Sequence, residues 1–285
     1  ELPSPMCLGT LMTGTIRGMV YRGKDLENPL NYVRINLPYM LPTCVEKFIY
    51  VDTDTLMLGR IEDLFATPLG KHVIGSPEFC EYKFQDYFTA DFWKNHTLSA
   101  KFEKSKKACY FNPGVMVVNP AAWRKAKATE ELLRWMKVQK ASSVPLYTLG
   151  SLPPFLLVFA GQVASIGKAW NEHDLGCNCG VIPVPSKARL LHWSCGDKPW
   201  RRIKSGAPCV IDSYYWRPYD LLGGVQDRNW CDDGDLPARV ASLPVLHASE
   251  GVEQDMGPAL FEQLYIPSKP RHCPAPVRVP GLQAG

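Results

Sequence analysis

Lys47-Phe-Ile-Tyr-Val-Asp52-Thr53-Asp54-Thr55 is the stretch of sequence that decides both the fold and the chemistry of this chain. Its apolar run is β-branched and aromatic, which predicts a strand, and two carboxylates follow it two residues apart. Alternation along an extended chain points Asp52 and Asp54 to the same side. Paired carboxylate oxygens suit Mn²⁺ or Mg²⁺, which keep positions open for the phosphate oxygens of a substrate. An Asp pair at a strand end is also a common turn or helix-cap feature, so this stretch alone leaves both interpretations open.

A second stretch favours the metal interpretation: Arg189-Leu-Leu-His192-Trp193-Ser194-Cys195-Gly196-Asp197-Lys198-Pro199-Trp200. A short apolar strand ends here at His192, whose imidazole nitrogen is a candidate third metal ligand. Lys198 follows downstream, where its ammonium group can reach a phosphate. A lone His before Trp is otherwise more often a buried, hydrogen-bonded core residue. Combined with the upstream aspartates, His192 and Lys198 predict a site for a metal-bound diphosphate.

The chain resembles glycosyltransferase family 8, the retaining nucleotide-sugar transferases, and within that family the plant galacturonosyltransferase-like proteins. The resemblance covers about residues 26 to 222 in collinear order, so it does not depend on any single short pattern. Its matching blocks are Asn28-Pro-Leu-Asn-Tyr-Val-Arg34, Asp52-Thr53-Asp54, Val73-Ile-Gly-Ser-Pro-Glu78-Phe-Cys80, Cys109-Tyr-Phe-Asn112-Pro-Gly114-Val-Met-Val-Val118, Arg134-Trp-Met-Lys-Val-Gln139, Leu149 to Gly161, Trp170-Asn171, and His192 to Trp200.

The expected fold is α/β. The pattern predicts strands near 47–52, 71–75, 115–118, 162–166 and 189–193, alternating with helices that include 121–140 and 152–160. The resemblance implies a GT-A type, Rossmann-like nucleotide-sugar transferase domain with a mostly parallel central sheet, and ligands bind such sheets beyond the strand ends. We assign residues 1–222 to this domain and 223–285 to a loosely ordered Pro/Gly-rich tail with one short helix near 258–264.

The resemblance also implies roles for individual residues. Asp52, Asp54 and His192 would hold Mn²⁺ or Mg²⁺. Positions matching the donor-binding residues of the family are Arg34, Thr53, Glu78, Asn112, Gly114, Gly196 and Lys198. Asn112 and Glu78 would bind hydroxyls of the donor sugar, and Arg34 a phosphate or the sugar. Arg34 could equally be a surface helix residue, and Asn112 before a proline could simply shape a turn.

Two departures from the family pattern bear on activity. In the pattern His-x-x-Gly-x-x-Lys-Pro-Trp, Cys195 holds the glycine position, and its Cβ restricts the close backbone approach that glycine permits. Asp197 adds a negative charge beside the expected diphosphate.

Where many family members carry Asp or Gln, this chain and the plant subgroup have Pro153-Pro154, which cannot attack a sugar. A covalent protein nucleophile of the kind retaining glycosidases use is therefore not expected.

Composition is that of a globular protein, and it excludes an obvious nucleic-acid binder. Net charge is +4 and the basic residues are interleaved with acidic ones, so there is no basic patch for a phosphate backbone. Ten cysteines and an Asn95-His96-Thr97 glycosylation acceptor favour an oxidising compartment, for which we expect the Golgi lumen. Cys177-x-Cys179 lacks a second pair at zinc spacing, which leaves a disulfide or free thiols. About 45 residues precede the Asp-x-Asp strand, fewer than the family usually has, so we expect an N-terminally shortened domain whose anchor or signal is absent.

The predicted function is that of a metal-dependent retaining glycosyltransferase. The resemblance implies a UDP-sugar donor, UDP-galacturonate in the plant subgroup, a cell-wall polysaccharide acceptor such as pectin, and association with other glycosyltransferases. One alternative is a non-catalytic family member that assists other transferases. A more distant one is a haloacid-dehalogenase-type phosphatase, since Asp52-Thr53-Asp54-Thr55 also fits its nucleophile motif and Asp232-Asp233 imitates its late acidic pair.

Overall fold

The computed structural model describes residues 29–177, 184–204, 206 and 209–220. The predicted tail 223–285, its expected helix near 258–264 and the acidic pair Asp232-Asp233 lie outside these residues. The described residues form two compact units. Unit 1 holds residues 29–50 and 65–167, and unit 2 holds residues 51–64 and the described residues from 168 onward.

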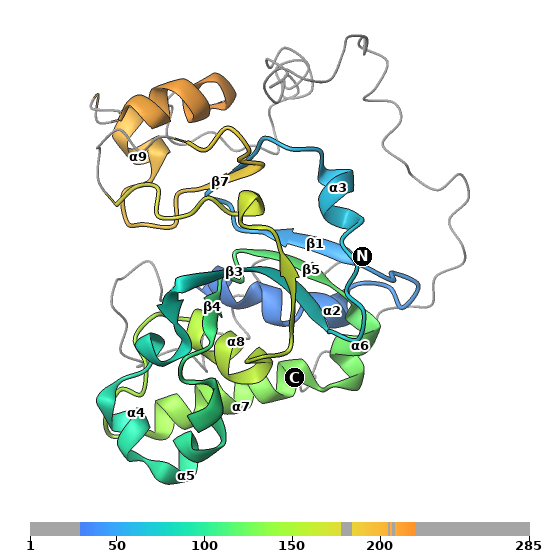
Figure 1. Ribbon diagram of the computed structural model, residues 1–285, viewed down its shortest axis with the longest axis vertical. Coiled ribbons are helices and arrows are strands. Elements are labelled where there is room, and N and C mark those ends of the chain that lie inside the picture. Colours follow the sequence, from blue (N-terminus) through green and yellow to red (C-terminus); the bar gives the residue numbers. More distant parts are fainter. Residues whose placement is uncertain (1–28, 178–183, 205, 207–208, 221–285) are drawn as a thin grey trace, which may run out of the picture. The chain divides into compact units, whose positions relative to one another are not determined.

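Unit 1 is built on a mixed sheet (Figure 1). Strand β3 (Ile74–Lys83) lies at its centre, pairing antiparallel with β5 (Val115–Val118) and β4 (Cys109–Phe111) and parallel with β6 (Val163–Ile166). β1 (Phe48–Val51) lies beside β5. The α/β class is confirmed, but the expectation of a mostly parallel sheet is wrong. β3 runs on past its predicted end, and this extension pairs antiparallel with β4, a strand that the sequence pattern did not predict.

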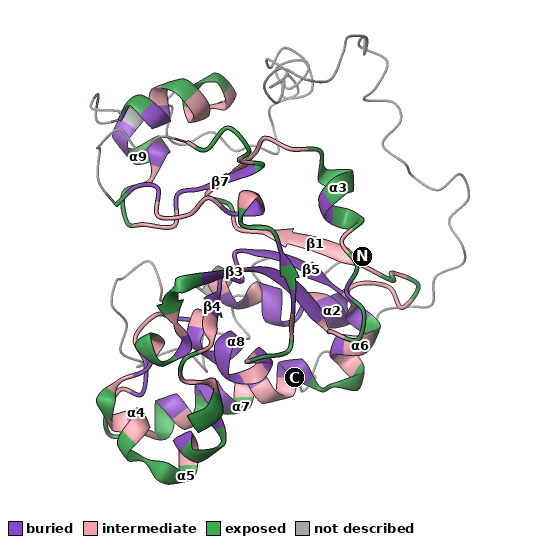
Figure 2. Cartoon of the chain, viewed as in Figure 1, coloured by how far each residue is buried: buried purple, intermediate pink, exposed green. Residues whose placement is uncertain are grey.

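Helices cover this sheet and bury a large aromatic core (Figure 2). The N-terminal elements are the 3₁₀ helix η2 (Pro29–Ile35) and α2 (Leu37–Met40). Between β3 and β4 lie η3 (Phe84–Tyr87), α4 (Ala90–Lys94), α5 (His96–Ser99) and η4 (Ala100–Ser105). The helices after β5 are α6 (Pro120–Lys125), α7 (Ala128–Ala141) and α8 (Leu152–Phe159). None of the helices in the described ranges is long and apolar enough to cross a membrane.

The core of unit 1 explains the aromatic richness of the sequence. Trp123, Trp135 and Phe155 are fully buried, as the helical periodicity of the first two predicts. Phe84 and Phe92, from the aromatic-rich segment after β3, pack into the same cluster. A disulfide between Cys80 and Cys109 ties β3 to β4. The aromatic segment therefore serves mainly to close the core.

Unit 2 is smaller and carries a two-stranded sheet of its own. β2 (Thr55–Met57) pairs antiparallel with β7 (Leu190–His192), so the strand predicted near 189–193 does not complete the main sheet. Its other elements are α3 (Ile61–Phe65), η5 (Lys168–Trp170), α9 (Pro199–Lys204), the π-helix η6 (Asp212–Trp216) and η7 (Arg217–Tyr219). Its core is a small cluster of Leu175, Leu191, Trp193, Cys209 and Ile211.

Candidate metal and donor-phosphate site

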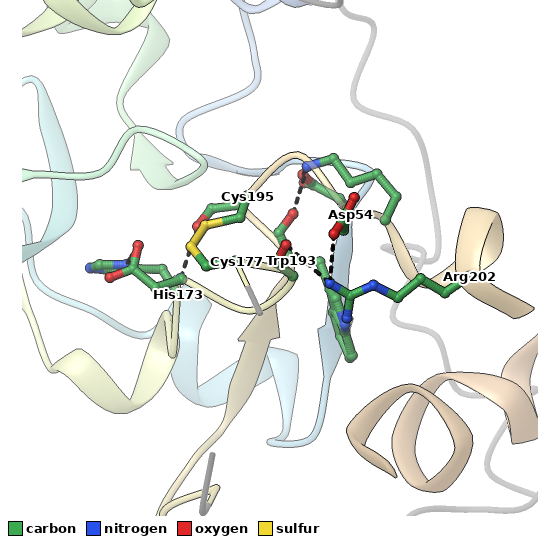
Figure 3. The surroundings of a disulfide bond; sticks show 11 residues. Asp54, His173, Cys177, Trp193, Cys195 and Arg202 are labelled. Carbon is green, nitrogen blue, oxygen red and sulfur yellow. Dashed lines mark hydrogen bonds and ion pairs between the residues drawn. A yellow bond between two sulfur atoms is a disulfide. The ribbon is translucent and has the colours of Figure 1, made fainter. Parts of the chain in front are cut away.

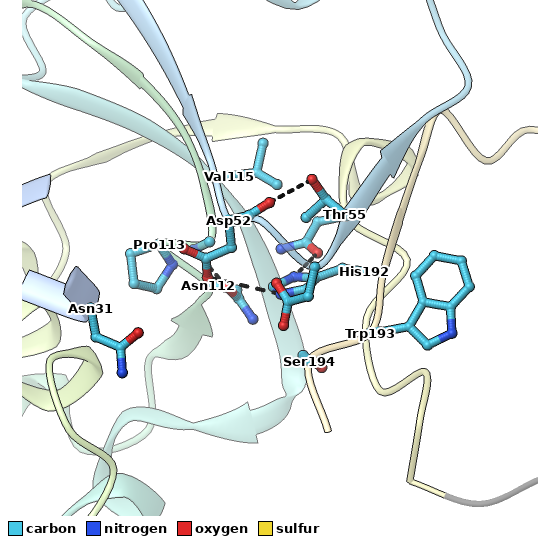
Figure 4. Close-up of polar contacts among 12 residues, drawn as sticks. Asn31, Asp52, Thr55, Asn112, Pro113, Val115, His192, Trp193 and Ser194 are labelled. Carbon is cyan, nitrogen blue, oxygen red and sulfur yellow. Dashed lines mark hydrogen bonds and ion pairs between the residues drawn. The ribbon is translucent and has the colours of Figure 1, made fainter. Parts of the chain in front are cut away.

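The Asp-x-Asp stretch forms a tight turn that leads directly into β2. The Thr55 hydroxyl donates to the carbonyl of Asp52 over 2.7 Å, closing the turn. The β2–β7 register then sets Thr55 opposite His192, and the Trp193 amide donates to the Asp54 carbonyl over 2.9 Å. Two segments about 140 residues apart in sequence are thereby held backbone to backbone, and Figure 4 shows Asp52, Thr55 and His192 gathered at this point.

The three predicted metal ligands come together. His192 Nε2 lies 3.2 Å from Asp54 Oδ1 and 3.9 Å from Asp52 Oδ2. All three ligand atoms lie within 4.8 Å of one another. Exposure falls from 29% for the Asp52 side chain to 15% for Asp54 and 3% for His192, so the cluster opens to solvent on its Asp52 side.

This arrangement fits a divalent cation. Two ligands about 2.1 Å from an ion and at right angles to each other are about 3.0 Å apart, close to the separations seen here. Two carboxylate oxygens and one imidazole nitrogen suit Mn²⁺, and they leave further coordination positions for water or phosphate oxygens. The paired negative charges call for a cation, since like charges this close repel each other.

Lys198 joins this cluster, as predicted. Its Nζ lies 2.6 Å from Asp54 Oδ2 and 2.6 Å from the Trp193 carbonyl oxygen. Burial on its own would raise the pKa of Asp54, but the hydrogen bond and charge of His192, together with Lys198, outweigh it and lower the pKa to about 2. Asp54 is therefore ionised throughout the physiological pH range, as a metal ligand must be.

The loop that carries Lys198 is fixed to residues 175–177 (Figure 3). A disulfide joins Cys195 to Cys177, and the Cys195 amide donates to the Leu175 carbonyl over 3.2 Å. Gly176 has φ +83°, and a Cβ built on it would lie 2.2 Å from the carbonyl oxygen of Asp197. Only glycine permits this backbone approach. Of the alternatives open at Cys177, the disulfide is the one observed, and Cys179 lies outside the described residues.

The charge of Asp197, predicted to oppose a diphosphate, is paired with Arg202. Arg202 Nη2 lies 3.0 Å from Asp197 Oδ2 and also donates to the Gly176 carbonyl over 3.2 Å. Arg202 is buried and its Nη1 faces Asp212 Oδ2 at 3.5 Å, while Asp212 Oδ1 accepts from Trp193 Nε1 over 2.7 Å. This ion-pair network anchors the Lys198 loop, and the positive charge of Arg202 offsets the negative charge of Asp197.

Arg34 is not the surface helix residue of the alternative interpretation. It is buried in unit 1, where its guanidinium donates to the Pro113 carbonyl and to Ser151 Oγ, and it stacks over the rings of Tyr50 and Phe155. These contacts fix the guanidinium of Arg34 inside unit 1, and a role toward a donor phosphate stays a prediction.

The remaining residues of unit 1 that were predicted to bind the donor lie on or next to β3 and β4. Asn112 is buried, and its Oδ1 accepts from the Gly114 amide over 2.8 Å, so it does shape the turn after β4. Glu78 is half-buried on β3, in register with Phe111. In unit 2, Thr53 is exposed in the aspartate turn, and Gly196 has open space around its Cα. The predicted site residues thus fall into a unit 1 set and a unit 2 set.

Sequence reasoning missed the residues that support the site from behind. Asn171 forms a polar contact with His192, and Gly176 and Arg202 hold the Lys198 loop. Trp170-Asn171 stood among the matching blocks without a role. No sequence pattern indicated the roles of Gly176 and Arg202, because their partners are backbone groups or residues that come close only in the folded chain.

Comparison with known proteins agrees with this geometry. The family model of glycosyl transferase family 8 matches residues 15–204. "Probable galacturonosyltransferase-like 7" of Arabidopsis thaliana is 43% identical over 224 residues, covering 77% of this chain and 59% of that protein. "Probable galacturonosyltransferase-like 10" from the same plant is 45% identical over 202 residues, covering 69% and 54%. The chain therefore spans little more than half of the length of these curated relatives.

A solved structure shows the same fold. The galactosyltransferase LgtC, in complex with donor and acceptor sugar analogues, superposes with a TM-score of 0.53 at 17% identity, covering 77% of this chain and 76% of LgtC. The architecture is thus that of a GT-A glycosyltransferase. With a matching family model over most of its length and relatives above 40% identity, the chain belongs to glycosyl transferase family 8.

Proposed function

We propose that this chain is a metal-dependent retaining glycosyltransferase that moves a sugar, galacturonate, from a UDP-sugar to a cell-wall polysaccharide such as pectin. The observation that carries the proposal is the cluster of Asp52, Asp54 and His192 with Lys198 bound to Asp54. The names of the Arabidopsis relatives support the choice of galacturonate. Family membership replaces the phosphatase interpretation.

The roles of the site residues follow from their charges. Asp52, Asp54 and His192 would hold the ion, which supplies positive charge to the diphosphate leaving group when bound. Lys198 is bonded to Asp54, and its ammonium group would also contact a phosphate oxygen of the bound diphosphate. Arg202 holds the Asp197 carboxylate, which limits the repulsion of that diphosphate.

The transfer step needs no protein nucleophile. Pro153 and Pro154 are buried in the first turn of α8 and neither can attack a sugar. We propose attack by the acceptor hydroxyl on the face from which the diphosphate departs. The bond between the anomeric carbon and the phosphate oxygen breaks, the bond to the acceptor oxygen forms, and the acceptor proton passes to the leaving phosphate.

We also propose that the protein works in an oxidising lumen, that of the Golgi, beside other glycosyltransferases. Two disulfides, Cys80–Cys109 and Cys177–Cys195, support this location because such bonds persist mainly in oxidising compartments.

The test is a transfer assay. The 285-residue chain is incubated with Mn²⁺, oligogalacturonide acceptors and separate UDP-sugars, and the anomeric configuration of the product is read by NMR. We expect transfer from UDP-galacturonate with retention, and loss of transfer in the near-isosteric variants Asp52→Asn and Asp54→Asn. Metal-dependent UDP binding without transfer from any donor would instead favour a non-catalytic family member.

A further inference from the structure

Asn171 is a buried polar residue directly behind the candidate metal ligand His192. Its side chain is 0% exposed and its Oδ1 lies 2.9 Å from His192 Nδ1. The other end of its amide, Nδ2, is buried with no hydrogen-bond partner among the described residues. A buried donor without a partner destabilises the folded state. Stability alone therefore does not account for an amide here, whereas a role toward His192 does.

The backbone on both sides of this amide is fixed to the histidine strand. The Glu172 amide donates to the Leu190 carbonyl over 2.9 Å, and the His192 amide donates to the Glu172 carbonyl over 2.9 Å. The Asn171 amide itself donates to the Lys168 carbonyl over 2.8 Å, which closes the turn of η5. On the other side of Asn171, the Arg189 amide donates to the Ala169 carbonyl over 2.6 Å, so the carboxamide is held in one place relative to the imidazole ring.

The protons of the imidazole ring indicate what this contact does. Nε2 is the ring nitrogen that faces Asp54 Oδ1 and Asp52 Oδ2, so Nε2 must offer its lone pair to a cation. A neutral imidazole that binds through Nε2 carries its proton on Nδ1, and that proton needs an acceptor. We propose that Asn171 is a positioning residue whose Oδ1 accepts the Nδ1 proton of His192, holding the tautomer and the ring plane that metal binding requires. The inference rests on the proposed metal site.

The choice of an amide fits the charges of the cluster. Asp52 and Asp54 already supply the two negative charges that balance a divalent cation, and Lys198 pairs with Asp54. A carboxylate behind His192 would add a third negative charge to a site whose two aspartates already balance a divalent cation. A neutral acceptor orients the ring without adding charge.

The first test is the affinity for Mn²⁺ alone, measured from the electron paramagnetic resonance of free Mn²⁺. Asn171→Leu keeps the side-chain volume but removes the acceptor, and we expect its affinity to fall about 10- to 100-fold. Asn171→Asp keeps an acceptor oxygen in place and should restore most of the affinity at pH 8. Equal affinities of wild type and a folded Asn171→Leu variant would overturn the inference.

The second test needs no metal and no variant. In the metal-free wild-type protein with ¹⁵N-labelled histidine, NMR should show the Nδ1 of His192 carrying a slowly exchanging proton. An unprotonated Nδ1 would mean that Asn171 donates to the ring through Nδ2, and this would overturn the inference whatever the metal data show. If Nδ1 is protonated but the wild type binds no Mn²⁺, the proposed metal-dependent function fails, while the assignment of Asn171 Oδ1 as the acceptor of the Nδ1 proton stands.

Discussion

Replacing Gly176 by alanine tests whether the backbone approach at this glycine holds the Lys198 loop in place. The new Cβ would lie 2.2 Å from the Asp197 carbonyl oxygen, where an unstrained carbon–oxygen contact is about 3.3 Å or longer. One of the two segments must therefore move by about 1 Å. Alanine at φ +83° adds the cost of a left-handed backbone, about 1–2 kcal/mol.

The expected total is a loss of about 2–5 kcal/mol, when the left-handed backbone is added to about 1–3 kcal/mol for overpacking. For a protein of this size the loss corresponds to a fall in Tm on the order of 10 °C. Because Asp197 directly precedes Lys198, the displacement should also weaken UDP binding in the presence of Mn²⁺. Differential scanning calorimetry and a UDP titration measure the two effects.

Gly196 provides the matched control in the same loop. A Cβ built there meets nothing within 4 Å, so Gly196→Ala should leave Tm within about 1 °C of the wild type. If Gly196 takes the place of the pattern glycine that Cys195 replaces and lies against a donor phosphate, this variant should weaken UDP binding without a loss of stability. A Gly176→Ala variant as stable as Gly196→Ala would refute the packing argument.

Three further perturbations have defined outcomes. Asp54→Asn should cost the metal-free protein about 2 kcal/mol near neutral pH, measured by urea unfolding in EDTA. The folded pKa of about 2 lies below the ordinary Asp pKa of 3.8, so this stabilisation is present above about pH 4 and disappears as the pH falls through 2. Replacing both Cys177 and Cys195 by serine removes a cross-link between residues 18 apart, worth about 3 kcal/mol, and should lower both Tm and UDP affinity. Arg202→Met should cost about 3–5 kcal/mol by chemical unfolding, because it leaves the Asp212 carboxylate buried without its cation.

Each of these perturbations has a control. A pH-independent difference between wild type and Asp54→Asn would contradict the assigned role of the charge. Replacing Cys80 and Cys109 by serine should lower Tm with no change in Mn²⁺ affinity, because that disulfide lies in unit 1. Adding Asp212→Asn to Arg202→Met should recover part of the lost stability, and no recovery would contradict the ion-pair explanation.

The metal ligands could be predicted from sequence because each one lies at the end of a short apolar run. The turn before β2 and the end of β7 are local features, and the family pattern supplied the pairing of the two segments. Their register, Thr55 opposite His192, then places Asp54 and His192 together without any further long-range information. The structure brings the three predicted residues together, and their role as metal ligands stays a prediction.

The supporting residues could not be predicted, since their roles depend on contacts that only the fold creates. Asn171 and Arg202 act on a side chain and on a loop reached through tertiary packing. The glycine that the backbone approach requires is Gly176, whose partner Asp197 lies 21 positions further along the chain. The sequence drew attention to the glycine position held by Cys195, where the structure has a disulfide.

Secondary structure shows the same division between local and tertiary signals. Asn119 caps α6 by accepting from the Ala122 amide, but the single helix expected over 121–140 is two helices. The break falls at Lys127, which adopts φ +51° in a segment without glycine or proline. Trp123 Nε1 donates to Thr129 Oγ1 across the break, so buried tertiary contacts accompany a bend that local propensity does not indicate.

The most direct test of the central claim is calorimetric titration of UDP into the metal-stripped chain, with and without Mn²⁺. We expect binding only when Mn²⁺ is present, and its loss in Asp54→Ala, because Asp54 contacts both the imidazole and the lysine of the proposed site. UDP binding of equal strength without metal, or in the Asp54→Ala variant, would contradict a donor site built on these residues.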